Sequence, residues 1–348
     1  MLIGVVACEV VLIAIKWSPQ KTTSEYMQFG YSTGIPVWDE DGILEGKAPV
    51  KVKLFQYDEE LFWKTIPDTE FTNSQGFRGK REVAVVNRND AIRILILGDS
   101  CSFLGRKLYA DFLFEALARD YPEAQFEIIN ASVPGYTSFQ GEKLLKRLMQ
   151  YKPHYACIYF GWNDHWILPS GYSDQFHYEL IHSFKVVQLV KIMMARIMNR
   201  RDYRVPPDGY RDNLTAMLNE LKANGAIPVM IAAPSGYAGE EMPRWAYDFY
   251  REYYGMTVDE IKGIPATHEA YANIAARVAE DADAIFVDAQ GHFNRLSPSM
   301  KPFFRNDLIH LTEKGHQVLA QEIYSQLIHY NSSHHLTWNG LVQAETAK

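Results

Sequence analysis

The chain has 348 residues, 47% of them hydrophobic, so it is long enough to form one large domain with an appendage. Its net charge of −7 argues against a nucleic-acid binder, because no excess of basic side chains is available to contact phosphates. The three cysteines, Cys8, Cys101 and Cys157, are too few for a disulfide framework and lack the spacing of metal ligands.

The first stretch of the chain, from Leu2 to Ile15, is apolar except for Glu9. Fourteen residues are few for a helix that crosses a bilayer, and no basic residue precedes the run as in a secretory signal. We nevertheless expect residues 1–16 to be an export or anchoring segment that brings residues 2–15 to a membrane. This would place the protein outside the cytoplasm. A packed core helix is the alternative.

Residues 17–92 are rich in Pro, Gly, Asp and aromatic residues and contain only short alternating runs, such as residues 50–54. This composition predicts irregular structure with one or two small strands. We expect this N-terminal extension either to pack on the main domain or to link it to the first segment.

From Ile92 onward, strand-like and helix-like patterns alternate. The expected strands are Arg93–Leu97, Glu127–Asn130, Tyr155–Phe160, Pro228–Ala232 and Ala284–Val287. The expected helices are Tyr109–Asp120, Phe139–Gln150, Asp208–Asn224, His268–Asp281 and Thr312–His329. Five strands separated by helices predict an α/β domain with a parallel sheet covered on both faces. We expect this domain to span residues 93–330, followed by a C-terminal tail over residues 331–348.

Two segments interrupt the alternation. Glu179–Arg201 has a helical pattern in which every charged residue after the first is basic. It either lies on an acidic membrane surface or, as we favour, presents the solvated face of a helix that caps the domain. Ser235–Gly263 is rich in aromatic residues, including Tyr237 and Tyr250, which suit either the rim of a sugar-binding cleft or the packing of a long loop.

The apolar run Ile94–Leu97 ends in Gly98, Asp99 and Ser100. This pattern predicts a buried parallel strand that brings Ser100 to the carboxyl edge of the sheet, where open α/β folds bind ligands. We therefore expect Ser100 to be a nucleophile, and Asp99 to hold the turn through backbone hydrogen bonds.

A serine hydroxyl needs a base within hydrogen-bond reach to become nucleophilic. Asp307 and His310 are three residues apart in the segment that leads into the last helix. His310 is the candidate base, and Asp307 is the carboxylate that would orient its ring. An Asp-x-x-His at a helix start can also be a capping arrangement, although Thr312 is the better candidate for that cap.

Attack on an ester builds negative charge on the carbonyl oxygen, which hydrogen-bond donors must stabilise. The candidate donors are the backbone N–H groups of Ser100 and Gly135 and the side-chain amide of Asn163. Gly135 suits a tight turn, and Asn163 follows the expected strand that ends at Phe160. We expect Asp164 to support the loop of Asn163.

These segments, in this order, resemble the four blocks of the SGNH (GDSL-type) hydrolase family. The resemblance extends from about Arg93 to about Ile328 and assigns the family's Ser, Gly, Asn and His to Ser100, Gly135, Asn163 and His310, with Asp307 completing the triad. One departure is Ser132, where relatives often carry a second glycine. The resemblance implies a three-layer α/β/α sandwich with a flavodoxin-like strand order of 2-1-3-4-5.

The function that this combination predicts is a serine esterase or acyl hydrolase that works through a Ser100 acyl-enzyme, with O-acetyl or similar small acyl groups on a carbohydrate as the favoured substrate. A lipid esterase, a carbohydrate O-acyltransferase and a non-catalytic polysaccharide-binding or assembly protein are the alternatives. No metal or organic cofactor is expected, because His154, His165 and His292 lack metal-like spacing and no Gly-x-Gly-x-x-Gly or Walker-type loop follows a strand. The expected partner is an acylated small molecule or carbohydrate, with no nucleic acid.

Overall fold

The computed structural model describes residues 2–17, 54–87, 90–168, 171–237, 242, 244–338 and 340–341. Residues 18–53 of the expected N-terminal extension lie outside the described residues, and so does nearly all of the alternating run at 50–54. The side chains of Trp245, Phe249, Tyr253 and Tyr254 in the aromatic segment also lie outside them.

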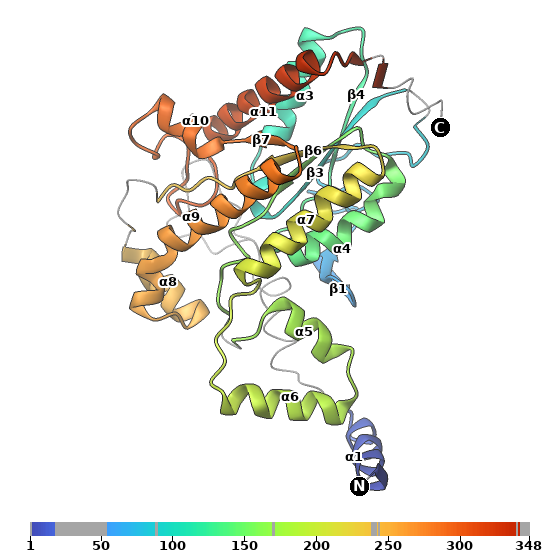
Figure 1. The fold of residues 1–348 in the computed structure, drawn as a ribbon, viewed down its shortest axis with the longest axis vertical. Coiled ribbons are helices and arrows are strands. Elements are labelled where there is room, and N and C mark those ends of the chain that lie inside the picture. Colours follow the sequence, from blue (N-terminus) through green and yellow to red (C-terminus); the bar gives the residue numbers. More distant parts are fainter. Residues whose placement is uncertain are drawn as a thin grey trace.

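A sheet of five parallel strands forms the centre of the molecule (Figure 1). The strands are β3 (Ile92–Gly98), β4 (Phe126–Asn130), β5 (Tyr155–Tyr159), β6 (Ile227–Ile231) and β7 (Ile285–Val287). Each lies within one residue of its expected bounds. Their spatial order, β4-β3-β5-β6-β7, is 2-1-3-4-5 in chain order. The expected α/β class and flavodoxin-like order are confirmed.

Every residue of β3 is buried, because helices cover both faces of the sheet. Successive side chains of a strand point to opposite faces. Ile94 and Ile96 accordingly pack in one apolar cluster, whereas Leu95 and Leu97 pack in the other. The continuous apolar run is therefore what a central parallel strand requires, and it carries the chain directly to Ser100.

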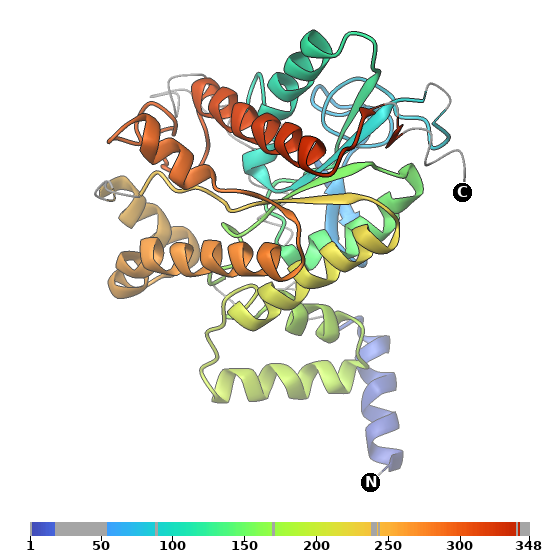
Figure 2. The same ribbon diagram turned by 45° about the horizontal axis from the view of Figure 1, so that its top comes forward.

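The two helical layers are visible in Figure 2, with the sheet between them. One layer contains α3 (Tyr109–Asp120), α10 (Ala289–Leu296) and α11 (Glu313–Ser333). The other contains α4 (Ser138–Leu148), which continues into η3 (Met149–Tyr151), together with α7 (Pro207–Ala223) and α9 (Val258–Asp281). The three-layer sandwich is confirmed.

Helix α9 begins ten residues before the expected start at His268. The Thr257 hydroxyl accepts from the Glu260 backbone N–H at 3.2 Å, and the Glu260 carboxylate accepts from the Thr257 N–H at 2.7 Å. This capping box starts the helix upstream of Pro265, which the helix accommodates in its interior. Proline usually marks a helix boundary, but α9 continues through Pro265.

Both inserted segments differ from the expectation. The segment Glu179–Arg201 includes the end of α5 (Asp174–Ile181) and all of α6 (Lys185–Ile197), so it contains parts of two helices rather than one helix. The expected long loop at Ser235–Gly263 contains α8 (Arg244–Tyr254) and the first turns of α9, so the loop prediction is wrong there. Within this segment Tyr237 and Tyr250 are buried in the core, where their hydroxyls lie 3.1 Å apart, and neither forms a cleft rim.

The ends of the chain complete the fold. Before the sheet lie α1 (Leu2–Ala14) and a hairpin of β1 (Phe55–Asp58) and β2 (Phe62–Thr65). In the described part of the chain, no helix has both the length and the apolar character needed to cross a bilayer. Helix α11 runs to Ser333, past the expected start of the tail, and Trp338 packs against Phe126 and Tyr155.

Candidate active site

The candidate residues gather at the carboxyl edge of the sheet. Ser100 follows β3 as the first residue of the short helix η2 (Ser100–Ser102). Asp99 caps this helix, since its Oδ1 accepts from the Cys101 N–H at 2.8 Å. A chain that leaves a buried strand and turns at once into a helix leaves its first hydroxyl, that of Ser100, partly exposed.

The structure brings Ser100, His310 and Asp307 into a hydrogen-bonded row. The Ser100 Oγ lies 2.9 Å from His310 Nε2, and His310 Nδ1 lies 2.7 Å from Asp307 Oδ2. With the Nδ1 proton donated to the carboxylate, Nε2 presents its lone pair to the serine hydroxyl. This is the tautomer that a general base needs.

The turn that carries Asp307 and His310 is strongly constrained. The second oxygen of the carboxylate, Asp307 Oδ1, accepts from the backbone N–H groups of Ile309 and His310, each at 2.9 Å. Leu308 has a φ of 60°, a left-handed conformation that costs free energy for a branched side chain. The segment after β6 supports the turn, because the Gly236 N–H donates to the Leu308 carbonyl at 2.8 Å.

The electrostatics of this cluster keep Asp307 ionised. Burial by itself raises the pKa of Asp307, but the nearby His310 and the hydrogen bonds from its side chain and backbone outweigh burial and lower that pKa below its ordinary value. The carboxylate can therefore orient the imidazole and stabilise the imidazolium that forms when His310 takes a proton.

The loop after β4 carries Gly135, which has a φ of 82°. Three successive carbonyls of this loop each accept a hydrogen bond from a different segment. The Trp63 indole donates to the Pro134 carbonyl at 3.2 Å, the Arg204 guanidinium to the Gly135 carbonyl at 2.7 Å, and Asn163 Nδ2 to the Tyr136 carbonyl at 3.1 Å.

The hydrogen bond from Trp63 to the Pro134 carbonyl fixes the direction of the Gly135 N–H, the candidate oxyanion donor. In a trans peptide, the carbonyl and the N–H point in opposite directions. The Pro134 carbonyl and the Gly135 N–H belong to the same peptide, so Trp63 turns that N–H away from the β hairpin. The Ser100 N–H is the other backbone candidate, and as the first residue of η2 it has no intrahelical acceptor.

Asn163 lies beside the loop, but its amide is engaged. Asn163 Nδ2 donates to Asp99 Oδ2 at 3.0 Å as well as to the Tyr136 carbonyl, and an amide nitrogen carries only two hydrogens. Donation to a substrate oxyanion must therefore share or replace one of these bonds, as occurs when catalytic hydrogen bonds tighten on binding. Burial raises the pKa of Asp99 to about 6.

Asp164 supports the neighbouring loop from a fully buried position. Its Oδ1 accepts from the Ser138 N–H at 2.9 Å and from the Ser138 hydroxyl at 2.6 Å, and its Oδ2 accepts from the Gly161 N–H at 3.0 Å. Burial raises the pKa of Asp164 to about 7. The carboxylate thus ties the start of α4 to the segment that bears Asn163.

Two residues at the site had no signal in the sequence. Trp63 comes from β2, and Arg204 comes from the segment between α6 and α7. Arg204 forms a buried ion pair with Asp174, with its Nε 3.1 Å from Oδ1 and its Nη2 3.0 Å from Oδ2. Neither residue belongs to a short motif, because each reaches the loop only through the folding of a distant segment.

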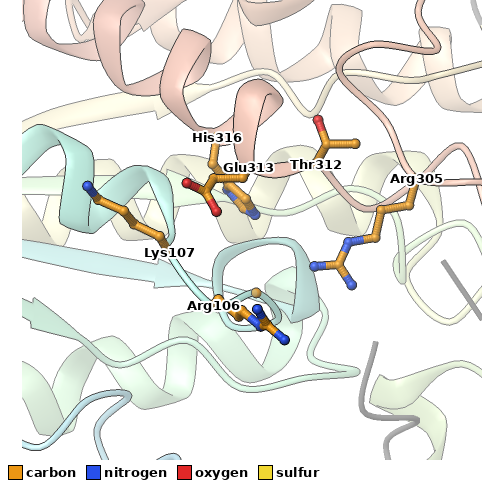
Figure 3. A pocket seen from close by; sticks show the side chains of 7 residues that line it. Arg106, Lys107, Arg305, Thr312, Glu313 and His316 are labelled. Atoms are coloured by element: carbon orange, nitrogen blue, oxygen red, sulfur yellow. The ribbon is translucent and has the colours of Figure 1, made fainter. Parts of the chain in front are cut away.

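A small pocket is formed by the same segments that carry Ser100 and His310 (Figure 3). The figure shows His316 and Glu313 projecting from the first turn of α11 and Arg305 from the preceding loop. Burial lowers the pKa of His316 to about 3, so its ring is neutral near pH 7. The pocket is lined mainly by polar and charged residues, namely Gly105, Arg106, Lys107, Arg305, Thr312, Glu313 and His316.

The described residues contain no group of three or more His, Cys, Asp or Glu arranged to hold a metal ion. His165 and His268 do approach each other, with 3.0 Å between Nε2 and Nδ1, but both rings are buried among Trp162 and other aromatic residues. Burial lowers the pKa of His268 to about 4. The pair therefore packs as neutral rings behind the Asn163 loop.

Comparison with known proteins identifies the family. Residues 96–318 match the GDSL-like Lipase/Acylhydrolase family. The chain belongs to this family. The matched stretch is the larger part of the chain and includes Ser100, Gly135, Asn163, Asp307 and His310. The predicted SGNH (GDSL-type) family is confirmed, and so is the prediction that the protein is a serine ester hydrolase.

No curated protein matches the chain. Among solved structures, it is similar to an acetylxylan esterase from Geobacillus stearothermophilus, with 18% identity over 71% of this chain and 95% of that one and a TM-score of 0.46. It is also similar to an α/β hydrolase from the metagenome of Lake Arreo, with 21% identity, 67% and 94% coverage and a TM-score of 0.46. A GDSL-like lipase from Parabacteroides merdae has 18% identity, 70% and 97% coverage and a TM-score of 0.44.

Proposed function

We propose that this ester hydrolase cleaves O-acetyl or similarly small acyl groups from a carbohydrate through a covalent Ser100 acyl-enzyme. The observation that carries the proposal is the continuous row from Ser100 Oγ through His310 to Asp307, with distances of 2.9 and 2.7 Å. Such a row activates a hydroxyl that is otherwise a weak nucleophile.

The reaction follows from this geometry. Ser100 Oγ attacks the ester carbonyl carbon while its proton moves to His310 Nε2, and the resulting oxyanion meets the N–H groups of Ser100 and Gly135. His310 then gives its proton to the departing sugar oxygen, leaving the acyl group on Ser100. Water attacks this ester in turn, with His310 again taking and returning a proton, and the free carboxylic acid leaves.

Polar side chains on the segments that carry Ser100 and His310 favour a carbohydrate as the alcohol part of the substrate. They include Arg106, Thr312 and Glu313, whose side chains offer hydrogen-bond donors and acceptors to hydroxyl groups. A long acyl chain would need an apolar channel instead. The buried Tyr237 and Tyr250 take no part in this argument, because they pack inside the domain.

The experiment is a substrate panel with purified protein. It contains acetylated mono- and oligosaccharides and p-nitrophenyl esters with acyl chains of two to ten carbons, and it is preceded by labelling with a fluorophosphonate probe. We expect the probe to label wild type but not Ser100→Ala, and kcat/KM to be highest for acetyl esters.

Each alternative gives a different result. A maximum of kcat/KM at long acyl chains would identify a lipid esterase. Transfer of acetyl to an added sugar in preference to water would identify an O-acyltransferase, which uses the same residues. No labelling and no turnover would leave a non-catalytic polysaccharide-binding or assembly protein.

A further inference from the structure

An apolar surface at one end of the molecule is separate from the catalytic edge. It consists of α1 and the outward side of α6, and we refer to it as the α1–α6 surface. In both ribbon views α6 crosses the end of the molecule opposite α11, and α1 projects beyond it (Figures 1 and 2). The two helices contact each other.

The apolar side of α6 faces away from the protein. Gln188, Ile192 and Ala195 are buried against the domain. At 100° per residue, the opposite side of the helix holds Val190, Met193, Met194 and Ile197. All four are exposed, and Ile197 is 81% exposed. A helix on the surface of a water-facing domain has the reverse arrangement, so the outward side of α6 is built to contact an apolar medium.

Among residues 4–14 of α1, only Glu9 and Leu12 are half-buried, and the other residues are exposed. Its large side chains Val5, Val6, Val10 and Val11 are all exposed, although they point in different directions. Its one charged residue, Glu9, is occupied, because the carboxylate accepts from the backbone N–H groups of Lys185 and Val186 at 2.9 and 2.8 Å. Glu9 thereby caps α6 and joins the two helices.

Charge is arranged at the borders of the outward side of α6. All charged residues of this helix are basic: by the same helical spacing, Lys185 and Arg196 lie along one border and Lys191 along the other. Lys191 also pairs with Glu179 at 3.2 Å. Lys16 lies two residues past the end of α1. An apolar strip between basic borders is the pattern of helices that lie in the headgroup region of a bilayer with anionic lipids.

We propose that the α1–α6 surface docks the protein on a membrane that contains anionic lipids, with α6 lying along the headgroup boundary and α1 entering one leaflet. A single protein partner would cover one side of α1, whereas acyl chains surround a helix on all sides. The 13 residues of α1 extend about 20 Å, against a hydrocarbon core roughly 30 Å thick, and this length fits entry into one leaflet.

Vesicle sedimentation tests the proposal. The purified full chain is mixed with vesicles of phosphatidylcholine alone or with 30% phosphatidylglycerol, about one lipid in three being anionic. We expect wild type to sediment with the anionic vesicles, and Met194→Glu combined with Ile197→Glu to lower the bound fraction at least about fivefold. Arg196→Glu should reduce binding to anionic vesicles more than binding to neutral ones.

The matched control is Leu296→Glu, because Leu296 lies on α10 with 55% exposure, against 56% for Met194. It should bind like wild type. All variants should hydrolyse a soluble acetyl ester at the wild-type rate, which separates this proposal from the proposed function. Two results would overturn it: no sedimentation of wild type with either vesicle, or a dimer that Ile197→Glu splits while vesicles do not compete.

Discussion

The Ser100–His310–Asp307 row and the loop of Gly135 lie at the same edge of the sheet but are held by different kinds of contact. Asp307 and His310 are three residues apart and bond through both side chain and backbone. The carbonyls of Pro134 and Gly135 are instead bonded by Trp63 and Arg204, 71 and 69 positions away in the chain. The base is therefore organised locally, whereas the oxyanion loop depends on distant segments.

This difference explains what the sequence could reveal. Asp307 and His310 form a short pattern with a fixed spacing, and Ser100 follows an apolar run that only a buried strand needs, so both were predictable. All five strands were also predictable, because each is a short apolar run that ends near a glycine or a polar turn.

The remaining features depend on tertiary contacts. Trp63 lies in a short hairpin, and its indole has meaning only when the Pro134 carbonyl is nearby. The outward apolar side of α6 could not be distinguished from an inward one by its period alone, since periodicity gives the faces of a helix but not which face is buried. The engagement of Asn163 by Asp99 likewise depends on two strands being adjacent.

Removing the nucleophile should produce the largest effect. Ser100→Ala should lower kcat for a p-nitrophenyl ester by roughly 10⁴–10⁶-fold, and His310→Ala should lower it by a similar amount. The double variant should lose little more, because the two groups act as a unit. Additive losses in the double variant would show that Ser100 and His310 work separately. His329→Ala on the exposed side of α11 is the control and should keep wild-type kcat.

Breaking the ion pair between Arg204 and Asp174, behind the oxyanion loop, should produce the next largest effect. Arg204→Met leaves the Asp174 carboxylate buried without its partner and frees the Gly135 carbonyl, so unfolding free energy should fall by about 3–5 kcal/mol. A second change, Asp174→Leu, removes the buried charge and should restore part of the lost free energy of unfolding. Urea unfolding measures this recovery. The second change should not restore the kcat that Arg204→Met lowers by freeing the Gly135 carbonyl. Recovery of both would mean that the pair stabilises the fold without holding the loop.

Asp99, which precedes the nucleophile Ser100, should make the free energy of unfolding depend on pH. Because burial raises the pKa of Asp99 to about 6, the folded state binds a proton more readily than the unfolded state between about pH 4 and 6. Its contribution to unfolding free energy thus falls by about 3 kcal/mol as the pH rises through that window. Asp99→Asn lacks this term, so its Tm relative to wild type should increase from pH 4 to pH 7 by about 5 °C. If the Tm difference between Asp99→Asn and wild type is the same at pH 4 and pH 7, the raised pKa of Asp99 is contradicted.

The smallest effect tests the distant support of the loop directly. Trp63→Phe keeps an aromatic ring next to Tyr136 but removes the indole N–H that holds the Pro134 carbonyl. One lost hydrogen bond of about 1 kcal/mol should let that peptide rotate away from its productive direction in part of the molecules. We therefore expect kcat to fall about fivefold with KM nearly unchanged, since the Gly135 N–H acts on charge that develops in the transition state.

The matched control for this change is Tyr155→Phe, which removes a buried donor to Asn331 Oδ1 at 2.5 Å, at the start of β5 and away from the carboxyl edge of the sheet. It should cost similar stability while leaving kcat at the wild-type value. If Trp63→Phe and Tyr155→Phe lower kcat equally, the hairpin supports only the fold. If Trp63→Phe alone lowers kcat, a residue upstream of the matched family region sets the direction of a catalytic N–H, and the oxyanion loop depends on contacts that no short motif contains.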